Sequence, residues 1–500
     1  MVTLERSADR GAAGADFLQL DPAAAPARGL TSWLAGALRA GIRDGRLPAG
    51  TVLPASRVLA SDLGVSRGVI VEAYQRLGDE GLVGARQGAG TTVLPRSPHP
   101  PGGTASGGTA PLASAAPLRA LTGAPTLLDL PRPWRAHAEI DLSPGVPDLS
   151  AFPRAAWLRA ERAALASASA AELGYGDPRG SERLRAELAS WLARTRGIRA
   201  DPGSILVVAG VAQALTLLAQ VLRARGISRI AVEDPGSRGA REELAHWGMD
   251  LVPVPVDEQG LDVRALAGSG AQAALLTPAH QFPTGVVLAP PRRRALLDWA
   301  AGGGLVIEDD YDAEYRYDRA PVPAVQASGP DRVAYTGSTS KTLAPGLRLG
   351  WLIPPARLHA DLVTAKHASD LGCPALPQLA AAQLIASGEL DRHVRQVRGR
   401  QRQRRDALLA VLREQLPGAR VQGVPAGLHL LITFPGIPDQ PDDTELASRL
   451  QQDGVLVHPL SWHRVADGPP GLVLGYAAHP PDQLRDAAGR IARAVRDWSS

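Results

Sequence analysis

The spacing of hydrophobic residues changes along the chain, and its first part predicts a helical region. From residue 30 to residue 45, apolar side chains recur every three or four positions, as in an amphipathic helix, and Gly45 ends the pattern. Two shorter helices are predicted next, the first capped by Ser56 and the second by Ser66. Residues 82–93 carry apolar positions on both sides of a glycine-rich turn, which predicts a β-hairpin.

Helix, helix, tight turn, helix and hairpin is the order of elements in a winged helix-turn-helix. We therefore expect residues 25–94 to form a DNA-binding domain. Residues 95–139 are rich in proline, glycine and alanine and cannot form a core, so they are predicted to be a linker. A flexible chain of this length spans roughly 35 to 40 Å on average.

From residue 140 onward, short apolar runs alternate with helical segments, which is the pattern of an α/β domain. Several of these runs end in polar residues, and the carboxyl ends of strands are where open α/β sheets bind ligands. The sequence therefore predicts a mostly parallel sheet with helices on both faces, within a domain that spans residues 140–500. The runs predicted to be strands are 205–209, 230–232, 273–276, 305–307 and 332–335.

After about residue 390 the pattern shifts to a smaller set of strands, which indicates a small subdomain over residues 390–500. An arginine-rich helix at 391–405 comes first. Two interpretations of this helix stay open: a second DNA-binding surface and a solvated helix face. The predicted strands of the subdomain are 429–433, 455–457 and 472–474.

Composition limits the partners and the compartment. The chain has 54 Lys and Arg against 50 Asp and Glu, a formal net charge of +4, so nucleic-acid binding must come from a local patch. The single cysteine, Cys373, cannot form an intramolecular disulfide and fits a reducing compartment. No apolar run reaches the roughly 18 to 20 residues of a membrane span, and the N-terminus lacks the apolar core of a signal peptide. We expect a cytoplasmic protein with no membrane partner.

The most specific chemistry lies in the stretch Ser338–Gly350, which reads Ser-Thr-Ser-Lys-Thr-Leu-Ala-Pro-Gly-Leu-Arg-Leu-Gly. The amine of Lys341 can form a Schiff base with an aldehyde, whereas arginine is never deprotonated. Ser338, Ser340 and Arg348 suit a phosphate group. An aldehyde that carries a phosphate is pyridoxal 5'-phosphate (PLP). The segment resembles the lysine motif of fold-type I aminotransferases, in which Ser-Lys is followed by Gly-x-Arg-x-Gly.

The scarcity of lysine supports this assignment. Among the 54 basic residues only Lys341 and Lys366 are lysines. Arginine stands almost everywhere that a positive charge is needed, so a remaining lysine indicates a position where arginine cannot serve.

The resemblance to aminotransferases assigns further residues to the cofactor. It places the phosphate at a helix N-terminus formed by Gly210, Val211 and Ala212, where backbone N–H groups bind anions. It places Asp309 beside the pyridine nitrogen, which a buried carboxylate keeps protonated, and Tyr311 near the ring hydroxyl.

Two more segments follow from the same resemblance. Residues 280–285, His-Gln-Phe-Pro-Thr-Gly, stand where aminotransferases carry an Asn-Pro-x-Gly turn, and Gln281 is the predicted hydrogen-bonding side chain. Tyr175 resembles the tyrosine that reaches the phosphate of the partner subunit. No histidine is expected near the acidic residues 308–310, and no metal site is predicted.

The N-terminal region resembles the GntR family of bacterial regulators in its individual residues as well as in the order of its helices and strands. The matching residues include Leu53-Pro-Ala-Ser-Arg, Leu63-Gly-Val-Ser-Arg and Gly88-Ala-Gly-Thr. In that family the corresponding positions contact operator DNA at the starts of two helices and in the wing, and arginine there can reach guanine edges or phosphates. The residues so assigned are Arg57, Ser66, Arg67, Gln87 and Gly88.

Both halves together resemble the MocR-type subfamily of GntR regulators, with features of its PdxR-like branch, which governs vitamin B6 synthesis or salvage. The resemblance implies a head-to-tail homodimer that binds PLP at Lys341 and double-stranded operator DNA, and that acts as a transcription factor. An amino compound that reacts with PLP is a further candidate effector. The alternatives are an active aminotransferase with an accessory DNA-binding domain, and a vitamin B6 carrier with no DNA target.

Two positions depart from the aminotransferase pattern. Ser237 follows Asp-Pro-Gly where related sequences have an aromatic residue that can cover the cofactor. Val473 stands where aminotransferases carry the arginine that binds the substrate α-carboxylate, although Arg238 or Arg241 could supply that contact from elsewhere. We therefore expect a regulator and not a metabolic enzyme, with slow half-reactions still chemically accessible.

Overall fold

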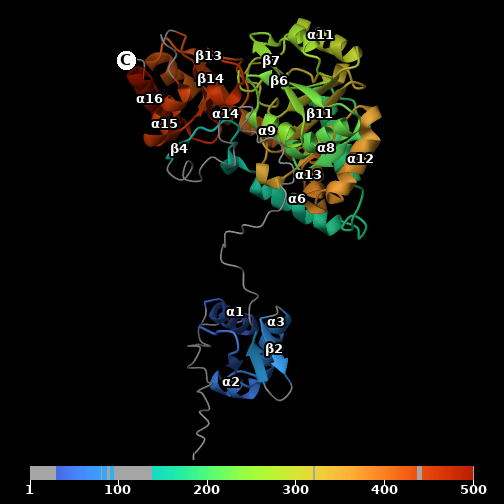
Figure 1. The fold of residues 1–500 in the computed structure, drawn as a ribbon, viewed down its shortest axis with the longest axis vertical. Coiled ribbons are helices and arrows are strands. Elements are labelled where there is room, and N and C mark those ends of the chain that lie inside the picture. Colours follow the sequence, from blue (N-terminus) through green and yellow to red (C-terminus); the bar gives the residue numbers. More distant parts are fainter. Residues whose placement is uncertain are drawn as a thin grey trace, which may run out of the picture. The chain divides into compact units, whose positions relative to one another are not determined.

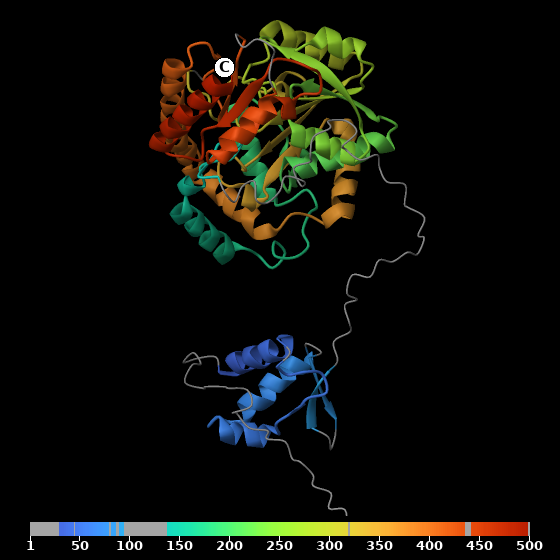
Figure 2. The same cartoon turned by 60° about the vertical axis from the view of Figure 1, so that its left-hand side comes forward.

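The computed structural model describes residues 30–44, 46–79, 82–86, 90–94, 138–318, 321–435 and 442–498. The chain divides into two compact units, Met1–Pro111 and Leu112–Ser500, drawn in Figures 1 and 2. Within the described residues, no helix is both long enough and apolar enough to cross a membrane.

The smaller unit is built from three helices and a three-stranded antiparallel sheet whose strand order is β1-β3-β2. Its core joins all three helices through the side chains of Leu38, Leu59, Ile70 and Leu77, which are fully buried. The elements are α1 (Leu30–Arg43), β1 (Val52–Leu53), α2 (Ser56–Asp62), α3 (Arg67–Asp79), β2 (Val83–Arg86) and β3 (Gly90–Val93).

This order confirms the predicted winged helix-turn-helix. One detail is wrong: Ser56 is the first residue of α2, and Ala55 occupies the N-cap position without a side-chain cap. Ser66 directly precedes α3, as predicted. The predicted helix end at Gly45 and the tip of the hairpin lie outside the described residues.

The larger unit contains an eight-stranded sheet of order β5-β12-β11-β10-β9-β6-β7-β8. The pairs from β11 through β10, β9 and β6 to β7 are parallel, whereas β12 runs antiparallel to both β5 and β11. The strands are β5 (Leu206–Val208), β6 (Arg229–Asp234), β7 (Asp250–Asp257), β8 (Gly260–Leu261), β9 (Ala273–Leu276), β10 (Leu305–Asp310), β11 (Val333–Ser338) and β12 (Gly350–Ile353).

Helices cover both faces of this sheet, which confirms the predicted architecture (Figure 2). One face packs against α8, α9 and α12, and the other against α7, α10, α11 and α13. The helices are α6 (Arg154–Ser167), α7 (Glu182–Arg196), α8 (Val211–Ala224), α9 (Arg238–His246), α10 (Val263–Gly268), α11 (Pro290–Ala301), α12 (Ala356–Asp370) and α13 (Ala375–Ala386).

The C-terminal part forms a small subdomain with its own core and a four-stranded sheet of order β13-β14-β17-β16. A segment from far earlier in the chain belongs to it: β4 (Ile140–Asp141) pairs in parallel with β15, and Ile140 and Leu142 are buried in the subdomain core. The other elements are α14 (Glu389–Gln415), β13 (Arg420–Gln422), β14 (His429–Thr433), α15 (Asp443–Gln452), β15 (Val455–Leu456), β16 (His458–Pro459), β17 (Gly471–Gly475) and α16 (Pro481–Trp498).

The arginine-rich stretch lies in α14 and is only partly solvated. Arg404 is buried and binds Asp148 at 2.8 Å, and Arg398 donates to the carbonyl of Glu314 at 2.9 Å. Arg402 remains largely exposed on the same helix. Part of the run therefore fixes the small subdomain to the rest of the unit, so a fully solvated face does not describe this helix.

Candidate cofactor site and DNA-reading residues

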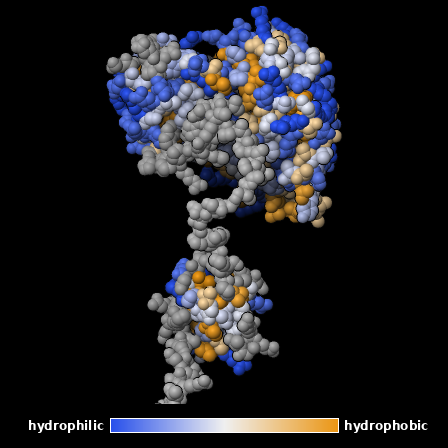
Figure 3. Space-filling model, in the orientation of Figure 1, coloured by the Kyte–Doolittle hydropathy of each residue, from blue (hydrophilic) through white to orange (hydrophobic). Residues whose placement is uncertain are grey.

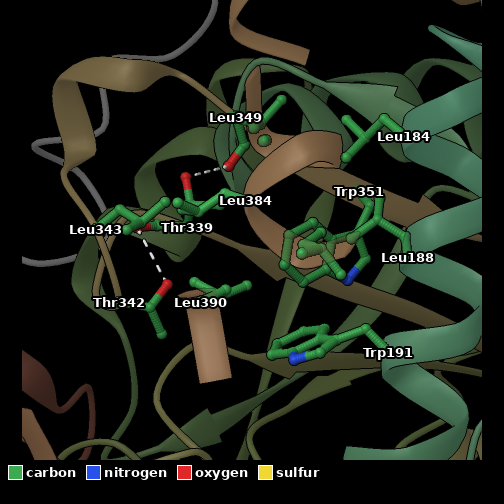
Figure 4. A pocket seen from close by; sticks show the side chains of 12 residues that line it. Leu184, Leu188, Trp191, Thr339, Thr342, Leu343, Leu349, Trp351, Leu384 and Leu390 are labelled. Atoms are coloured by element: carbon green, nitrogen blue, oxygen red, sulfur yellow. Dashed lines mark hydrogen bonds between the residues drawn. The ribbon is translucent and has the colours of Figure 1, made fainter. Parts of the chain in front are cut away.

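The loop that carries Lys341 connects β11 to β12 and is anchored from below by apolar packing (Figure 4). The hydroxyl of Thr339 donates to the carbonyl of Leu349 at 3.2 Å, and that of Thr342 donates to the carbonyl of Thr339 at 3.4 Å. The cavity beneath the loop measures about 10 Å³, scarcely room for one water, so this region is packing and not a ligand site. Its lining includes Leu184, Leu188, Trp191, Leu343 and Trp351.

The amine of Lys341 lies in an enclosed position at the end of β11. Its nitrogen donates to the carbonyl of Gly145 at 2.5 Å. Burial lowers the pKa of Lys341, while the nearby charges of Asp312 and Asp309 oppose that shift. A lowered pKa increases the neutral fraction of the amine, which is the form that attacks an aldehyde.

The second lysine is engaged elsewhere. Lys366 is fully buried, and its amine binds Asp370 at 2.6 Å, Gln213 at 3.0 Å and the thiol of Cys373 at 3.2 Å. These contacts give Lys366 a structural role. Lys341 is therefore the lysine whose surroundings suit covalent chemistry.

Three consecutive carboxylates end strand β10, and their partners differ. Glu308 accepts hydrogen bonds from the backbone N–H groups of Val325 and Gln326, both at 2.9 Å. Asp310 pairs with the buried Arg196 at 2.5 Å. The carboxylate of Asp309 receives only a long hydrogen bond of 3.3 Å from the hydroxyl of Thr336 among the contacts of the described residues.

Asp309 is therefore the carboxylate left for a ligand. Burial, together with the charge of Asp310, raises its pKa to about 7, although the hydrogen bond from Thr336 and the charge of Lys341 act in the opposite direction. A positively charged ring nitrogen would offset the cost of ionising this buried group.

The residues predicted to hold a phosphate lie close together at the start of α8. Gly210 caps the helix with φ of 84°, and the first N–H groups of the helix lack partners within it. The guanidinium of Arg348 lies beside it, because a Cβ on Gly210 would come within 3.1 Å of that group. Arg348 itself adopts a left-handed backbone with φ of 48°, which is uncommon for a residue with a side chain. The hydroxyl of Ser338 accepts from the N–H of Ser340 at 3.4 Å.

Gln281 is buried, and its polar atoms hold its own turn together. Its amide nitrogen donates to the carbonyl of Pro235 at 2.8 Å, and its oxygen accepts from the N–H and the hydroxyl of Thr284 at 3.0 and 2.6 Å. Its predicted contact with the cofactor stays a prediction.

The structure places histidines where the sequence predicted none. Nδ1 of His280 lies 3.1 Å from the hydroxyl of Tyr311 and 3.0 Å from a carboxylate oxygen of Asp312. Polar atoms of His280, Asp312 and His429 all lie within 4.8 Å of one another. The expectation of no histidine near the acidic cluster is therefore wrong. His280 stands in the same turn as Gln281, but nothing in the local sequence indicates its contact with Asp312, which comes from the fold.

The two departures from the aminotransferase pattern have clear structural roles. The hydroxyl of Ser237 caps α9 by accepting from the N–H of Ala240 at 3.3 Å. Val473 is fully buried in an apolar cluster with Leu431 and Leu460, against which Phe282 packs.

The two arginines considered as replacements are both buried. Arg241 donates to the carbonyls of Gly236, Trp462 and His463. Arg238 pairs with Glu242 at 2.7 Å, and its guanidinium lies 5.8 Å from the ring centre of Trp462. Its two terminal nitrogens have no hydrogen-bond partner among the described residues, so Arg238 keeps more capacity for an anion than Arg241.

Tyr175 differs from the buried residues described above because it lies on the surface. Its side chain is 89% exposed and stands at the wall of a cavity of about 800 Å³ formed by residues 171–186 and 370–379. Apolar groups gather at the edge of the larger unit where Figure 1 draws α6, as Figure 3 shows. Exposed large apolar side chains there and around the cavity are Leu158, Leu165, Leu173, Leu371 and Leu376.

The predicted DNA-reading residues of the smaller unit lie on its surface. Arg57, Ser66 and Arg67 are exposed or partly exposed at the starts of α2 and α3. Nε of Arg67 donates to the hydroxyl of Ser56 at 3.3 Å, which brings the two helix starts together. Gln87 and Gly88 lie outside the described residues.

Comparison with known families agrees with both halves of the chain. The family profile "Aminotransferase class I and II" matches residues 138–491, and "Bacterial regulatory proteins, gntR family" matches residues 30–93. The pyridoxine biosynthesis transcriptional regulator PdxR of Corynebacterium glutamicum is 35% identical over 459 residues, covering 91% of this chain and 93% of that protein. The chain belongs to the MocR-type subfamily of GntR regulators.

Other relatives of this regulator point the same way. The probable rhizopine catabolism regulatory protein MocR of Rhizobium meliloti is 32% identical over 471 residues, covering 91% of this chain and 92% of that protein. Among solved structures, a kynurenine aminotransferase of Pyrococcus horikoshii in complex with PMP superposes with a TM-score of 0.67 at 26% identity. That match covers 73% of the regulator and 92% of the aminotransferase.

The residues of this regulator fit pyridoxal 5'-phosphate. The enclosed amine of Lys341, the carboxylate of Asp309 without a strong partner, and the helix N-terminus at Gly210 with Arg348 beside it match an aldehyde, a pyridine nitrogen and a phosphate. Gly210 has no Cβ to occupy the space in front of the Arg348 guanidinium, so the anion-binding groups remain accessible to a ligand.

Proposed function

We propose that this MocR-type regulator binds operator DNA through its winged helix-turn-helix unit and holds PLP covalently at Lys341, and that the occupancy of this site controls transcription. One observation carries the proposal: a DNA-reading helix pair and a matched set of PLP-binding groups are present in the same chain. The alternative of a carrier without a DNA target is not favoured, because Arg57 and Arg67 stand exposed at the helix starts that read DNA.

Each residue has a stated task in this proposal. Lys341 bonds to the aldehyde, and Gly210, Val211, Ala212, Ser338, Ser340 and Arg348 hold the phosphate. Asp309 keeps the ring nitrogen protonated, and Tyr311 and Gln281 lie on the side of the ring hydroxyl. Bound PLP supplies an electrophilic carbon and an electron-withdrawing ring.

We further propose that the regulated genes belong to vitamin B6 metabolism. Similarity to a pyridoxine biosynthesis regulator over 91% of the chain supports this assignment. In that case PLP is both the cofactor and the signal. An amino compound that reacts with PLP is the second candidate signal, and a cytoplasmic location is part of this proposal because operator DNA is its target.

The regulator is proposed to act as a head-to-tail homodimer. Tyr175 is exposed on a large cavity surrounded by apolar side chains, as expected for a surface that a second copy covers. In this arrangement Tyr175 reaches the phosphate site of the partner subunit.

Regulation is favoured over metabolic turnover because the usual carboxylate contact is missing. Val473 is buried among apolar residues and cannot bind a carboxylate. The aminotransferase fold itself allows slow half-reactions, since Lys341 and Asp309 remain in place.

The experiment that tests the function is capture and sequencing of DNA from the protein's own genome, with and without added PLP. We expect a few discrete sites upstream of vitamin B6 genes, with a yield that depends on PLP. Arg67→Ala should lower the recovery of these sites, and Lys341→Ala should keep DNA binding but lose the PLP response. Uniform recovery of DNA in all variants would contradict the proposal.

A further inference from the structure

The contact between Tyr311, His280 and Asp312 determines where the tyrosine hydroxyl points. Nδ1 of His280 lies within hydrogen-bonding distance of three oxygens: both carboxylate oxygens of Asp312, at 3.1 and 3.0 Å, and the hydroxyl of Tyr311, at 3.1 Å. A ring nitrogen carries either one hydrogen or one lone pair. Its state is therefore set by the strongest of these neighbours.

The carboxylate of Asp312 decides that state. It accepts hydrogen bonds and would be repelled by a lone pair, so Nδ1 of His280 must carry the hydrogen. The hydroxyl of Tyr311 then cannot donate to Nδ1 and can only accept a share of the same N–H. Its own hydrogen is directed elsewhere.

The arrangement is enclosed and held from the small subdomain. His280 and Asp312 are 3% and 1% exposed. A Cβ on Gly427 would lie 2.0 Å from a ring carbon of His280 and 2.6 Å from a carboxylate oxygen of Asp312, so only glycine allows the backbone to cover the pair. Backbone N–H of Gly427 donates to the carbonyl of Tyr315 at 2.8 Å, and the hydroxyl of Tyr315 donates to the carbonyl of Lys341 at 3.0 Å.

We propose that Asp312 and His280 are positioning residues that turn the hydroxyl of Tyr311 into a hydrogen-bond donor aimed at the ring oxygen of the cofactor bound at Lys341. The inference rests on the proposed PLP site. It goes beyond that site because it assigns a role to two residues that need not touch the cofactor. Burial and the surrounding carboxylates raise the pKa of Tyr311 well above its usual value, so the hydroxyl keeps its hydrogen at neutral pH.

A donor to the ring oxygen has a measurable effect. It stabilises the more anionic form of the bound cofactor, and so lowers the pH at which the visible absorbance of the cofactor titrates. Loss of one hydrogen bond to a charged group corresponds to about one pH unit. The titratable groups that face Tyr311 and stay unchanged in the test are Asp309, Asp310, Glu233, His429 and Lys341.

The test is an absorbance titration of the PLP-loaded full-length protein and five single variants. Tyr311→Phe should raise the titration midpoint by about one unit. His280→Leu and the isosteric Asp312→Asn should raise it by a similar amount, because the tyrosine hydrogen is no longer directed. His280→Asn restores an N–H near the position of Nδ1 and should recover most of the wild-type midpoint. The exposed His246→Gln serves as the matched control and should leave the midpoint unchanged.

A double variant separates positioning from a general structural effect. If His280 acts through Tyr311, Tyr311→Phe combined with His280→Leu should titrate like Tyr311→Phe alone. Additive shifts, or a wild-type midpoint in both His280→Leu and Asp312→Asn, would overturn the inference. Because each variant must first show the covalent absorbance at Lys341, a failure of PLP binding itself would instead count against the proposed function.

Discussion

The two lysines of the chain differ in what surrounds their amines. Lys366 is held by Asp370, Gln213 and Cys373, whereas among the described residues Lys341 has one carbonyl partner, and burial lowers its pKa. The chemistry thus depends on the partners of each amine as well as on its position in a motif.

Lys341→Ala should remove the covalent bond to PLP. After PLP is added and unbound cofactor is removed by desalting, the wild-type protein should keep an absorbance band at the edge of the visible range. The variant should lack this band. The reason is that no other amine at the site can attack the aldehyde, since Lys366 is engaged. A spectrum unchanged by the substitution would rule Lys341 out.

Asp309→Asn should change how the stability of the cofactor-free protein depends on pH. In the folded chain the pKa of Asp309 is raised from 3.8 to about 7, so its protonated form is favoured, and the stability it contributes is lost as pH rises from about 4 to about 7. Asparagine does not ionise, so the variant does not lose this stability. Its free energy of unfolding should exceed that of the wild type by up to about 4 kcal/mol at pH 8. Urea unfolding at pH 4, 6 and 8 measures the difference, and a gap that does not widen with pH would contradict it.

Amino-acid turnover should be absent or slow because Val473 offers no hydrogen bond to a substrate carboxylate. Holding the reacting bond over the ring can be worth several kcal/mol of barrier. A single-turnover assay with a panel of amino acids and amines, followed by the spectrum of the cofactor, measures this. Arg238→Gln tests whether the terminal nitrogens of Arg238 supply a substitute contact. Several turnovers per second with any common amino acid would favour the aminotransferase alternative.

Local sequence motifs predict Lys341 and Asp309 as site residues, whereas residues that meet only through tertiary contacts leave no such local signal. Lys341 and Asp309 stand at strand ends, which hydrophobic runs mark, so the structure places them where they were predicted. His280 and Asp312 are 32 residues apart and meet only because the turn after β9 lies beside the end of β10. No periodicity carries that information.

At the scale of elements, strands with a clear local hydrophobic run were predicted, and a strand without one was missed. The runs at 273–276 and 429–433 match β9 and β14 in both bounds. Strand β7 was not predicted; it contains Pro253 and Pro255, and proline lacks a backbone donor. Its neighbour β8, at the sheet edge, pairs only with Val256 and Asp257, so β8 requires no donor from either proline.

The recognition helix α3 leads to a prediction at this scale. Arg67→Ala should cost roughly 1 to 3 kcal/mol of binding at a specific operator and leave PLP absorbance unchanged. The exposed Arg46→Ala, in the same unit, controls for loss of one positive charge. Titration of labelled operator at fixed salt measures both variants, and equal losses in the two would indicate only a general charge effect.

At the scale of the whole molecule, the exposed surface around Tyr175 predicts self-association. Light scattering at micromolar concentration should give the mass of a dimer when PLP is present. Tyr175→Ala should weaken PLP binding more than it weakens the fold, because the tyrosine is expected to reach the partner subunit's phosphate. A monomeric mass with bound PLP would contradict the head-to-tail arrangement.

Strand β4 determines which part of the larger unit the incoming chain is tied to. Ile140 and Asp141 pair with β15, Ile140 and Leu142 fill the core of the small subdomain, and Glu139 pairs with Arg490 at 2.9 Å. The chain is therefore fastened to the small subdomain before it enters the large sheet. A hinge rotation of that subdomain displaces the attachment point of the preceding segment, whereas a shift confined to the large sheet leaves it in place.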